Sequence, residues 1–137
     1  MFSPQTKRII GHIRCKYGAE PEFLWPEQSP DACVFRHTHN RKWFGIIMVV
    51  SGAKLGLKTD EKVCIIDLKF DKNQALDFAE NTPGIYPGYH MNKMNWITIV
   101  LDESMDDGMV FELVRKSFSL TIEPLKIKIK NIPEIIR

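Results

Sequence analysis

Two apolar segments, residues 33–38 and 42–50, lie so close in the chain that only a tight turn can join them. Both segments are rich in the β-branched and aromatic residues that favour strands, and the turn near His39-Asn40 has an Asn that tolerates left-handed backbone. Strands joined by a short turn pair antiparallel, because a parallel crossover needs about a dozen residues or more. The hairpin therefore predicts an antiparallel sheet.

Two further segments, residues 62–70 and 96–101, show the period of two that is typical of strands. Their first predicted face carries Cys64, Ile66, Leu68, Phe70, Ile97, Ile99 and Leu101. Their second predicted face carries Val63, Ile65, Asp67, Lys69, Trp96, Thr98 and Val100. We expect helices to cover the first face and the second to be partly open, with a weak ion pair between Asp67 and Lys69.

Helical patterns occupy residues 6–16, 73–80 and 104–122. Gly18 is predicted to end the first helix, Asp71 to cap the second, and Ser104 with Asp107 to form a near capping box on the third. The apolar stripe expected on the third helix consists of Met109, Val110, Leu113, Val114 and Phe118. The sequence therefore predicts an α+β fold, with an antiparallel sheet and helices on one face.

The chain of 137 residues is long enough for one domain with its own core. We assign residues 1–124 to this domain and residues 125–137 to a C-terminal extension, whose alternation from Leu125 to Lys130 predicts a docked strand or tail. Without a secretory signal or an apolar run that could span a bilayer, we expect a cytoplasmic monomer with no membrane association. The cysteines, Cys15, Cys33 and Cys64, are expected to be reduced and buried.

The segment from Pro83 to Thr98 combines stiff Pro-Gly dipeptides with aromatic and polar side chains. Its candidate ligand-binding residues are Tyr89, His90, Asn92, Lys93 and Trp96. Asn and Lys can donate to phosphate, and aromatic rings can stack on a planar ligand. The alternative is structural, with Trp96 packing on the sheet while His90 and Asn92 bond the loop backbone.

Basic residues cluster at the predicted hairpin tip, where Arg36, Arg41 and Lys42 accompany His37 and His39. With Lys93, these two arginines and Lys42 are the candidate nucleic-acid contacts, because lysine and arginine neutralise phosphates. The alternative is a solvated turn whose charges keep the edge soluble. His37 and His39 share one face of a strand, but a metal site needs at least a third ligand, so we expect neither a metal nor another cofactor.

Enzymatic motifs are absent from the sequence, which contains no G-x-S-x-G elbow, P-loop or G-x-G-x-x-G. The segment Gly52 to Gly56 is read as a flexible loop without the phosphate-loop spacing. We therefore do not expect an enzyme.

Four features together resemble the MmcQ/YjbR family of small bacterial proteins. They are the segments 42–45 (Lys-Trp-Phe-Gly), 67–69 (Asp-Leu-Lys) and 87–93 with Trp96, and the late pair Ser117-Phe118. The resemblance runs from the first helix to Glu123 and implies a CyaY-like α+β fold, which has been compared with a double-wing DNA-binding domain. The family is named as DNA-binding on that likeness, which is an argument by association.

Two functional hypotheses follow. The first is a DNA-binding module that contacts duplex DNA weakly through the basic hairpin and the Lys93 loop. The second is a module that binds a small molecule or a protein through the open sheet face and the surface from Tyr89 to Trp96.

Overall fold

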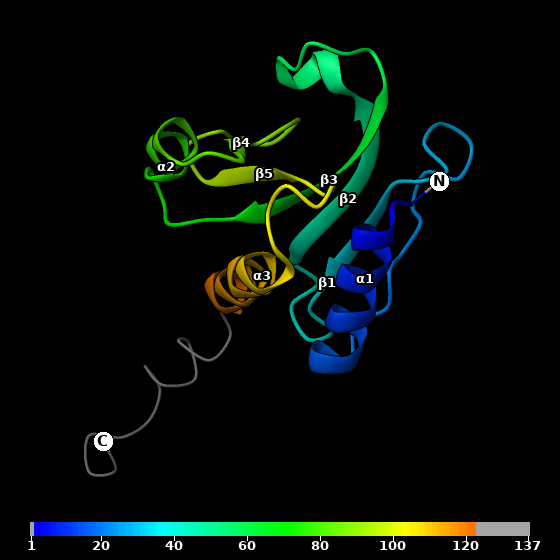
Figure 1. Cartoon of the computed structure of the whole chain (residues 1–137). Helices are drawn as coiled ribbons and strands as arrows, with labels where there is room; N and C mark the ends of the chain where they lie inside the picture. The colour runs from blue at the N-terminus through cyan, green and yellow to red at the C-terminus, as the bar shows by residue number, and fades with distance from the viewer. Residues whose placement is uncertain (1, 123–137) are drawn as a thin grey trace.

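The computed structural model describes residues 2–122, so the extension proposed for residues 125–137 lies outside the described residues. Five strands form one sheet in the order β1-β2-β3-β5-β4, and every neighbouring pair is antiparallel (Figure 1). The strands are β1 (Cys33–Arg36), β2 (Trp43–Ser51), β3 (Lys62–Lys69), β4 (Ile85–Pro87) and β5 (Trp96–Val100). The short strand β4 was missed by the sequence analysis, which treated its residues as loop.

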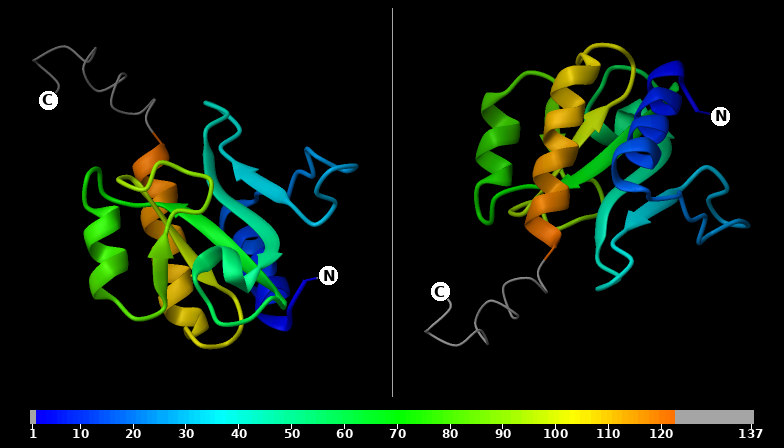
Figure 2. Two further views of the ribbon diagram at one scale, coloured as in Figure 1. Left: turned by 90° about the horizontal axis from the view of Figure 1, so that it is seen from above. Right: turned by 90° about the horizontal axis from the view of Figure 1, so that it is seen from below.

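Three α-helices lie side by side over one face of this sheet (Figure 2). They are α1 (Pro4–Tyr17), α2 (Ala75–Asn81) and α3 (Asp107–Thr121), and a 3₁₀ helix, η1 (Gly52–Leu55), lies between β2 and β3. The predicted α+β fold, an antiparallel sheet with helices on one face, is therefore confirmed. None of the described helices is long and apolar enough to cross a membrane.

The helix-covered face contains the main core. The strand register places Ile47, Ile66, Ile99 and Ile85 in one row across β2, β3, β5 and β4, and all four side chains are buried. Burial of such a side chain contributes about 1.5–3 kcal/mol, so this row is a large part of what holds the helices to the sheet. The face predicted from the period of two in residues 62–70 and 96–101 is the one observed.

Helix α1 ends at Gly18 as the sequence predicts, but it begins at Pro4, before the predicted start at residue 6. The Ser3 side chain accepts a hydrogen bond from the Thr6 amide at 3.1 Å, and Pro4 occupies the first turn, where a missing N–H costs little. Gly18 closes the helix in the left-handed conformation, with φ of 64°.

The predicted caps of the other two helices are wrong. Helix α3 is capped by Asp106, which accepts from the Met109 amide at 2.8 Å, whereas Ser104 bonds Asp102. Asp71 lies in a turn before α2 and makes an ion pair with Lys116 at 2.9 Å. For α3 the error comes from choosing the first of several suitable capping residues, whereas the N-cap of α2 is Gln74, which makes no side-chain capping hydrogen bond.

The buried stripe of α3 differs from the predicted one at its ends. Met109 is 49% exposed, whereas Ser117 and Thr121 are buried beside Val110 and Val114. The Ser117 hydroxyl donates to the Phe44 carbonyl at 2.6 Å and accepts from the Lys69 amide at 2.9 Å. Ser117 belongs to this stripe because it bonds the backbone of β2 and β3, and Thr121 because its hydroxyl bonds the His37 ring and the carbonyls of its own helix.

The cysteines divide into two groups. Cys33 and Cys64 are buried as expected, but Cys15 is exposed on α1. Cys15 lies outside the tight Ile9, Ile10, Ile13 stripe of that helix, which explains its position.

Candidate functional site

The second face of the sheet is covered where the sequence predicts an open surface. Asp67 and Thr98 are fully buried and Trp96 is 9% exposed. The covering segment is the chain between β4 and β5, which crosses this face in the left view of Figure 2. The prediction of a partly open face around Asp67 is therefore wrong, because a loop covers it.

Residues 88–95 form this covering segment, which we call the β4–β5 loop. Gly88 allows it to lie close to the sheet, since a Cβ there would come within 2.8 Å of the Trp96 Cβ. The Trp96 amide donates to the Asn92 carbonyl at 3.0 Å, and the Asn92 side chain accepts from the Met94 amide at 2.9 Å. Asn92 therefore has the loop-organising role that the structural alternative predicts.

Asp67 and Thr98 form a buried polar pair beneath the loop. The Thr98 hydroxyl donates to Asp67 Oδ1 and accepts from the Tyr89 amide at 2.8 Å, which links β3, β5 and the loop. The other carboxyl oxygen, Oδ2, is buried and has no hydrogen-bond partner among residues 2–122. Burying a polar atom without a hydrogen bond costs free energy, so the Asp67–Thr98 pair makes the fold less stable than apolar side chains would at these positions.

Burial also changes the charge of Asp67. It raises the pKa of the carboxyl from 3.8 to about 7, although the Thr98 hydroxyl, the Tyr89 amide and the Lys93 charge oppose the shift. The carboxyl is therefore partly protonated near neutral pH. The ion pair expected between Asp67 and Lys69 is not formed, since Lys69 Nζ instead lies 5.4 Å from the centre of the Trp96 ring.

The exposed side of the β4–β5 loop carries the other candidate residues. The rings of Tyr89 and His90 contact each other with centroids 4.1 Å apart, and His90 has the left-handed φ of 61°. Lys93 Nζ donates to the Gly88 carbonyl at 3.1 Å, while Trp96 packs inward against Val34 and Ile46. Of the five predicted ligand-binding residues, His90, Asn92 and Lys93 are exposed, Tyr89 is half-buried and Trp96 is buried.

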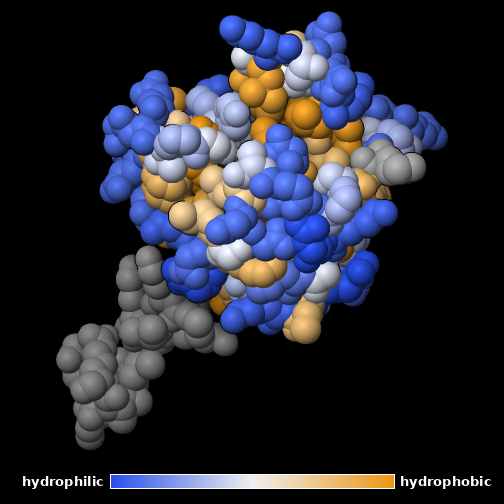
Figure 3. Space-filling view, viewed as in Figure 1, coloured by the Kyte–Doolittle hydropathy of each residue, from blue (hydrophilic) through white to orange (hydrophobic). Residues whose placement is uncertain are grey.

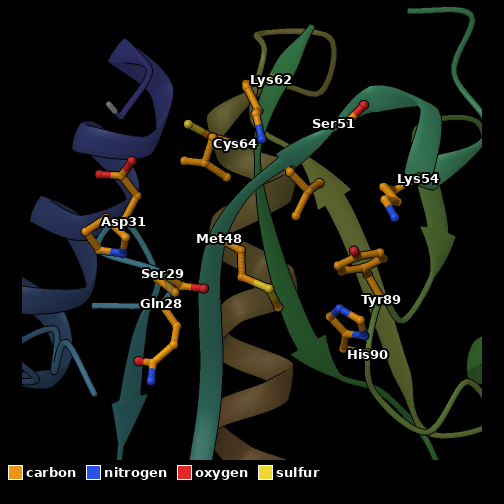
Figure 4. A pocket seen from close by; sticks show the side chains of 14 residues that line it. Gln28, Ser29, Asp31, Met48, Ser51, Lys54, Lys62, Cys64, Tyr89 and His90 are labelled. Atoms are coloured by element: carbon orange, nitrogen blue, oxygen red, sulfur yellow. The ribbon is translucent and has the colours of Figure 1, made fainter. Parts of the chain in front are cut away.

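Three of the candidate residues, Tyr89, His90 and Lys93, border two connected hollows. The larger, about 710 Å³, lies between residues 28–32 and 48–51, and Tyr89 and His90 stand over one side of it (Figure 4). The smaller, about 350 Å³, is lined by Lys54, Leu55, Tyr86, Pro87, Tyr89, His90 and Lys93. Lys54, Tyr89 and His90 border both hollows, so the two form one groove, which runs from the second face to the β2 edge, where Val49 and Cys64 of the first face also line it.

The sequence does not indicate Lys54 as a site residue, because the pattern of residues 52–56 predicts a flexible loop. The structure instead forms η1 there, ended by Gly56 with φ of 83°. Apolar side chains gather beside η1 at the top of Figure 3, in a cluster that includes Leu55, Leu57, Val63 and Tyr86. This packing holds η1 against the sheet and so places Lys54 at the groove.

At the basic hairpin tip, both arginines contact one acidic side chain. Arg36 makes two hydrogen bonds of 2.9 Å to Glu22, and Arg41 lies 3.9 Å from the same carboxylate. The left-handed residue of this turn is Arg41, with φ of 64°, and not Asn40 as the sequence suggests. The Asn40 side chain instead accepts a hydrogen bond from the Lys42 amide at 2.9 Å. One carboxylate therefore partly neutralises both arginines, and the proposed DNA contacts at this tip stay a prediction.

His37 is part of the core at the hairpin tip. It is 3% exposed, lies 2.7 Å from the Thr121 hydroxyl and packs against Phe44 and Phe118, and its pKa is lowered mainly by burial. The His37 and His39 rings are 5.6 Å apart, but within residues 2–122 no third His, Cys, Asp or Glu joins them in a metal-sized group.

Comparisons with known proteins agree with this architecture. The sequence model of the YjbR family matches residues 15–120. The chain is 41% identical to "Uncharacterized protein YyaQ" of Bacillus subtilis, covering 82% of this chain and 94% of that protein. It is 33% identical to "Uncharacterized protein YbdF" of Escherichia coli O157:H7, and the match covers 76% of this chain and 75% of that protein.

Solved structures show the same relationship. A crystal structure of a Pseudomonas syringae protein has a TM-score of 0.79 at 37% identity, covering 84% of this chain and 97% of that one. A Deinococcus radiodurans protein has a TM-score of 0.55 at 22% identity, covering 77% and 70%, and shares the fold. The family match and the close relatives make this chain a member of the YjbR family.

Proposed function

We propose that this protein is a non-enzymatic binding module that takes a small anionic ligand with a planar ring in the groove over the second sheet face. The observation that carries the proposal is the smaller hollow. Lys54 and Lys93 border it from two different segments, together with His90 and the ring of Tyr89. Among the described residues that line it, none is acidic.

The chemistry of these groups indicates the ligand class. Lysine ammonium groups are donors suited to phosphate or carboxylate, and an aromatic ring provides a stacking face. The left-handed backbone at His90 supports the proposal, because strained positions cluster at functional sites.

Calorimetry with adenosine monophosphate, which has both an anionic group and a planar ring, tests this proposal. Inorganic phosphate and adenosine serve as partial ligands, and we expect the monophosphate to bind more tightly than either. Lys54→Ala and Lys93→Ala should each weaken binding by up to about fivefold, the range for exposed charge pairs. Lys7→Ala, which removes the same charge from exposed α1, is the matched control and should have no effect.

Binding that is unchanged in both groove variants, or an equal loss in the Lys7 control, would refute the site. No detectable heat with all three probes would refute the ligand class.

DNA binding is the second candidate, supported by three lysines that line the connected hollows, Lys54, Lys62 and Lys93. Because Arg36 and Arg41 share Glu22, we expect the groove lysines to contribute more than the hairpin arginines. Three phosphate contacts give a log–log salt slope of about −2.7, whereas the four predicted from the sequence, Arg36, Arg41, Lys42 and Lys93, give about −3.6.

Fluorescence anisotropy with a labelled duplex at two salt concentrations distinguishes these sets. The double variants Lys54→Glu/Lys93→Glu and Arg41→Glu/Lys42→Glu change the charge equally, so the one with the larger loss identifies the contact surface. No binding by micromolar wild-type protein at low salt would remove DNA from consideration.

A further inference from the structure

Strand β2 extends beyond the strand that flanks it. Its pairing with β1 ends where Cys33 is opposite Ile47, yet β2 continues through Met48 to Ser51 with only β3 as a partner. The residues before Cys33 form turns instead of a strand, and the Ala32 amide donates to the Ser29 carbonyl at 3.0 Å. Four residues of β2 therefore lie at an open edge of the sheet.

The hydrogen-bond pattern shows which way the backbone points at this edge. Val34 exchanges two bonds with Glu22 on the outer side of β1, at 2.9 and 3.0 Å, so Val34 and Ile46 form a non-hydrogen-bonded pair. Ile47 then directs its N–H and C=O toward β1. Because these directions alternate along a strand, Val49 points the same way, past the end of β1.

The other side of β2 agrees with this assignment. The Gly52 amide donates to the Glu61 carbonyl at 2.8 Å, in line with the bonds that Met48 and Val50 direct toward β3. Val49 and Ser51 alternate with those residues. The N–H and C=O of Val49 thus face the larger hollow and bond no described residue.

The hollow beside this edge has room for a further strand. It measures about 710 Å³ and runs between β2 and residues 28–32, with the Lys54 and Lys62 side chains near its rim (Figure 4). The open stretch from Met48 to Ser51 contains neither a charged residue nor a proline, the usual protection of an exposed edge.

We propose that the β2 edge from Met48 to Ser51 binds an extended segment of a partner protein by β-strand addition. An extended backbone offers an acceptor for the Val49 N–H and a donor for its C=O at strand spacing, whereas an anion would be repelled by the carbonyl. Lys54 and Lys62, which outnumber Asp31 among the charged residues that line the hollow, favour acidic side chains in the segment. This surface goes beyond the proposed ligand site, since it needs neither Lys93 nor the smaller hollow.

The test is selection from a phage-displayed library of linear peptides on the full chain, followed by affinity measurement with the selected peptides. Val49→Pro removes the N–H that faces the edge and leaves the bonds of Met48 and Val50 to β3, and proline is tolerated on edge strands. We expect it to weaken peptide binding by about tenfold. Lys54→Glu/Lys62→Glu should also weaken binding, whereas Lys7→Ala and Lys93→Ala should not.

Amide hydrogen exchange of the wild-type protein gives a second readout that does not depend on the proline variant folding. The Val49 amide should exchange fast in the free protein and at least about tenfold more slowly with peptide bound, while the Ile47 and Val50 amides stay slow in both. An unchanged Val49 rate in the complex, or a selection that recovers no peptide above background, would overturn the proposal. A protein that fails to bind adenosine monophosphate but still binds the selected peptides would refute the proposed ligand site and leave strand addition supported.

Discussion

Each face of the sheet carries a row of side chains that crosses neighbouring strands, and the two rows differ in polarity. On the helix-covered face the row is Ile47, Ile66, Ile99 and Ile85, and all its members are apolar. One residue along, the row on the other face is Val34, Ile46, Asp67, Thr98 and Tyr86.

A carboxyl and a hydroxyl thus occupy the centre of the second face, under a loop, where apolar residues would be more stable. Their hydrogen bonds hold the loop that carries Tyr89, His90 and Lys93. The comparison indicates that the first face provides stability, while the second holds the loop of the proposed binding surface.

The largest change in the free energy of unfolding is expected for a substitution on the helix-covered face. Ile66→Ala removes a fully buried side chain at the centre of the row and should lower the free energy of unfolding by up to about 5 kcal/mol in urea. Met109→Ala, on the exposed side of α3, is the control and should change it by less than about 0.5 kcal/mol. A small loss for Ile66→Ala would show that this face is not the main core.

The second prediction concerns pH. Because folding raises the pKa of Asp67 from 3.8 to about 7, the folded state binds more protons than the unfolded state between these values. The stability contributed by this group should therefore fall as pH rises from about 4 to 7, by about 4 kcal/mol, and then level off.

Urea unfolding across this pH range measures the effect. Asp67→Asn keeps the shape and removes the titration, so the difference between wild type and variant isolates the carboxyl. Parallel pH profiles would contradict the buried, partly protonated Asp67.

Thr98→Val tests how the loop is attached. Valine keeps the volume but loses the hydroxyl that bonds Asp67 and the Tyr89 amide, so unfolding should cost about 1–3 kcal/mol less. Faster hydrogen exchange at Tyr89 should accompany this loss, while Ile99 on the other face of β5 stays protected. Equal changes at both residues would mean that the two faces are not separable.

The smallest effects are expected at the surface of the loop. Tyr89→Ala and Lys93→Ala should change stability by no more than about 1 kcal/mol while weakening ligand binding. Thermal melts with and without adenosine monophosphate measure both quantities. If both variants unfold the protein, the loop residues are structural.

Local patterns were sufficient to predict much of the fold. The period of two in residues 62–70 and 96–101 assigned their side chains to the correct faces, and Gly18 marked the end of α1. Strand β4 has three residues and includes a proline, so it offers no detectable alternation.

The site was less predictable because its key contacts join distant segments. The loop that buries Asp67 and the η1 turn that presents Lys54 come from separate parts of the chain. The Arg36–Glu22 pair likewise forms across the Glu22–Val34 bridge, which no local pattern indicates. Residue type suggested Tyr89, His90 and Lys93, but only the structure shows that Trp96 turns inward.

The most direct test of the central claim, that the second face is the binding surface, is a ¹⁵N-resolved NMR titration with adenosine monophosphate. We predict that the perturbed amides cluster at Lys54, Tyr89, His90 and Lys93, with those around Ile66 and the hairpin tip at Arg41 unchanged. Perturbations centred on the hairpin tip or on the helices would contradict the account.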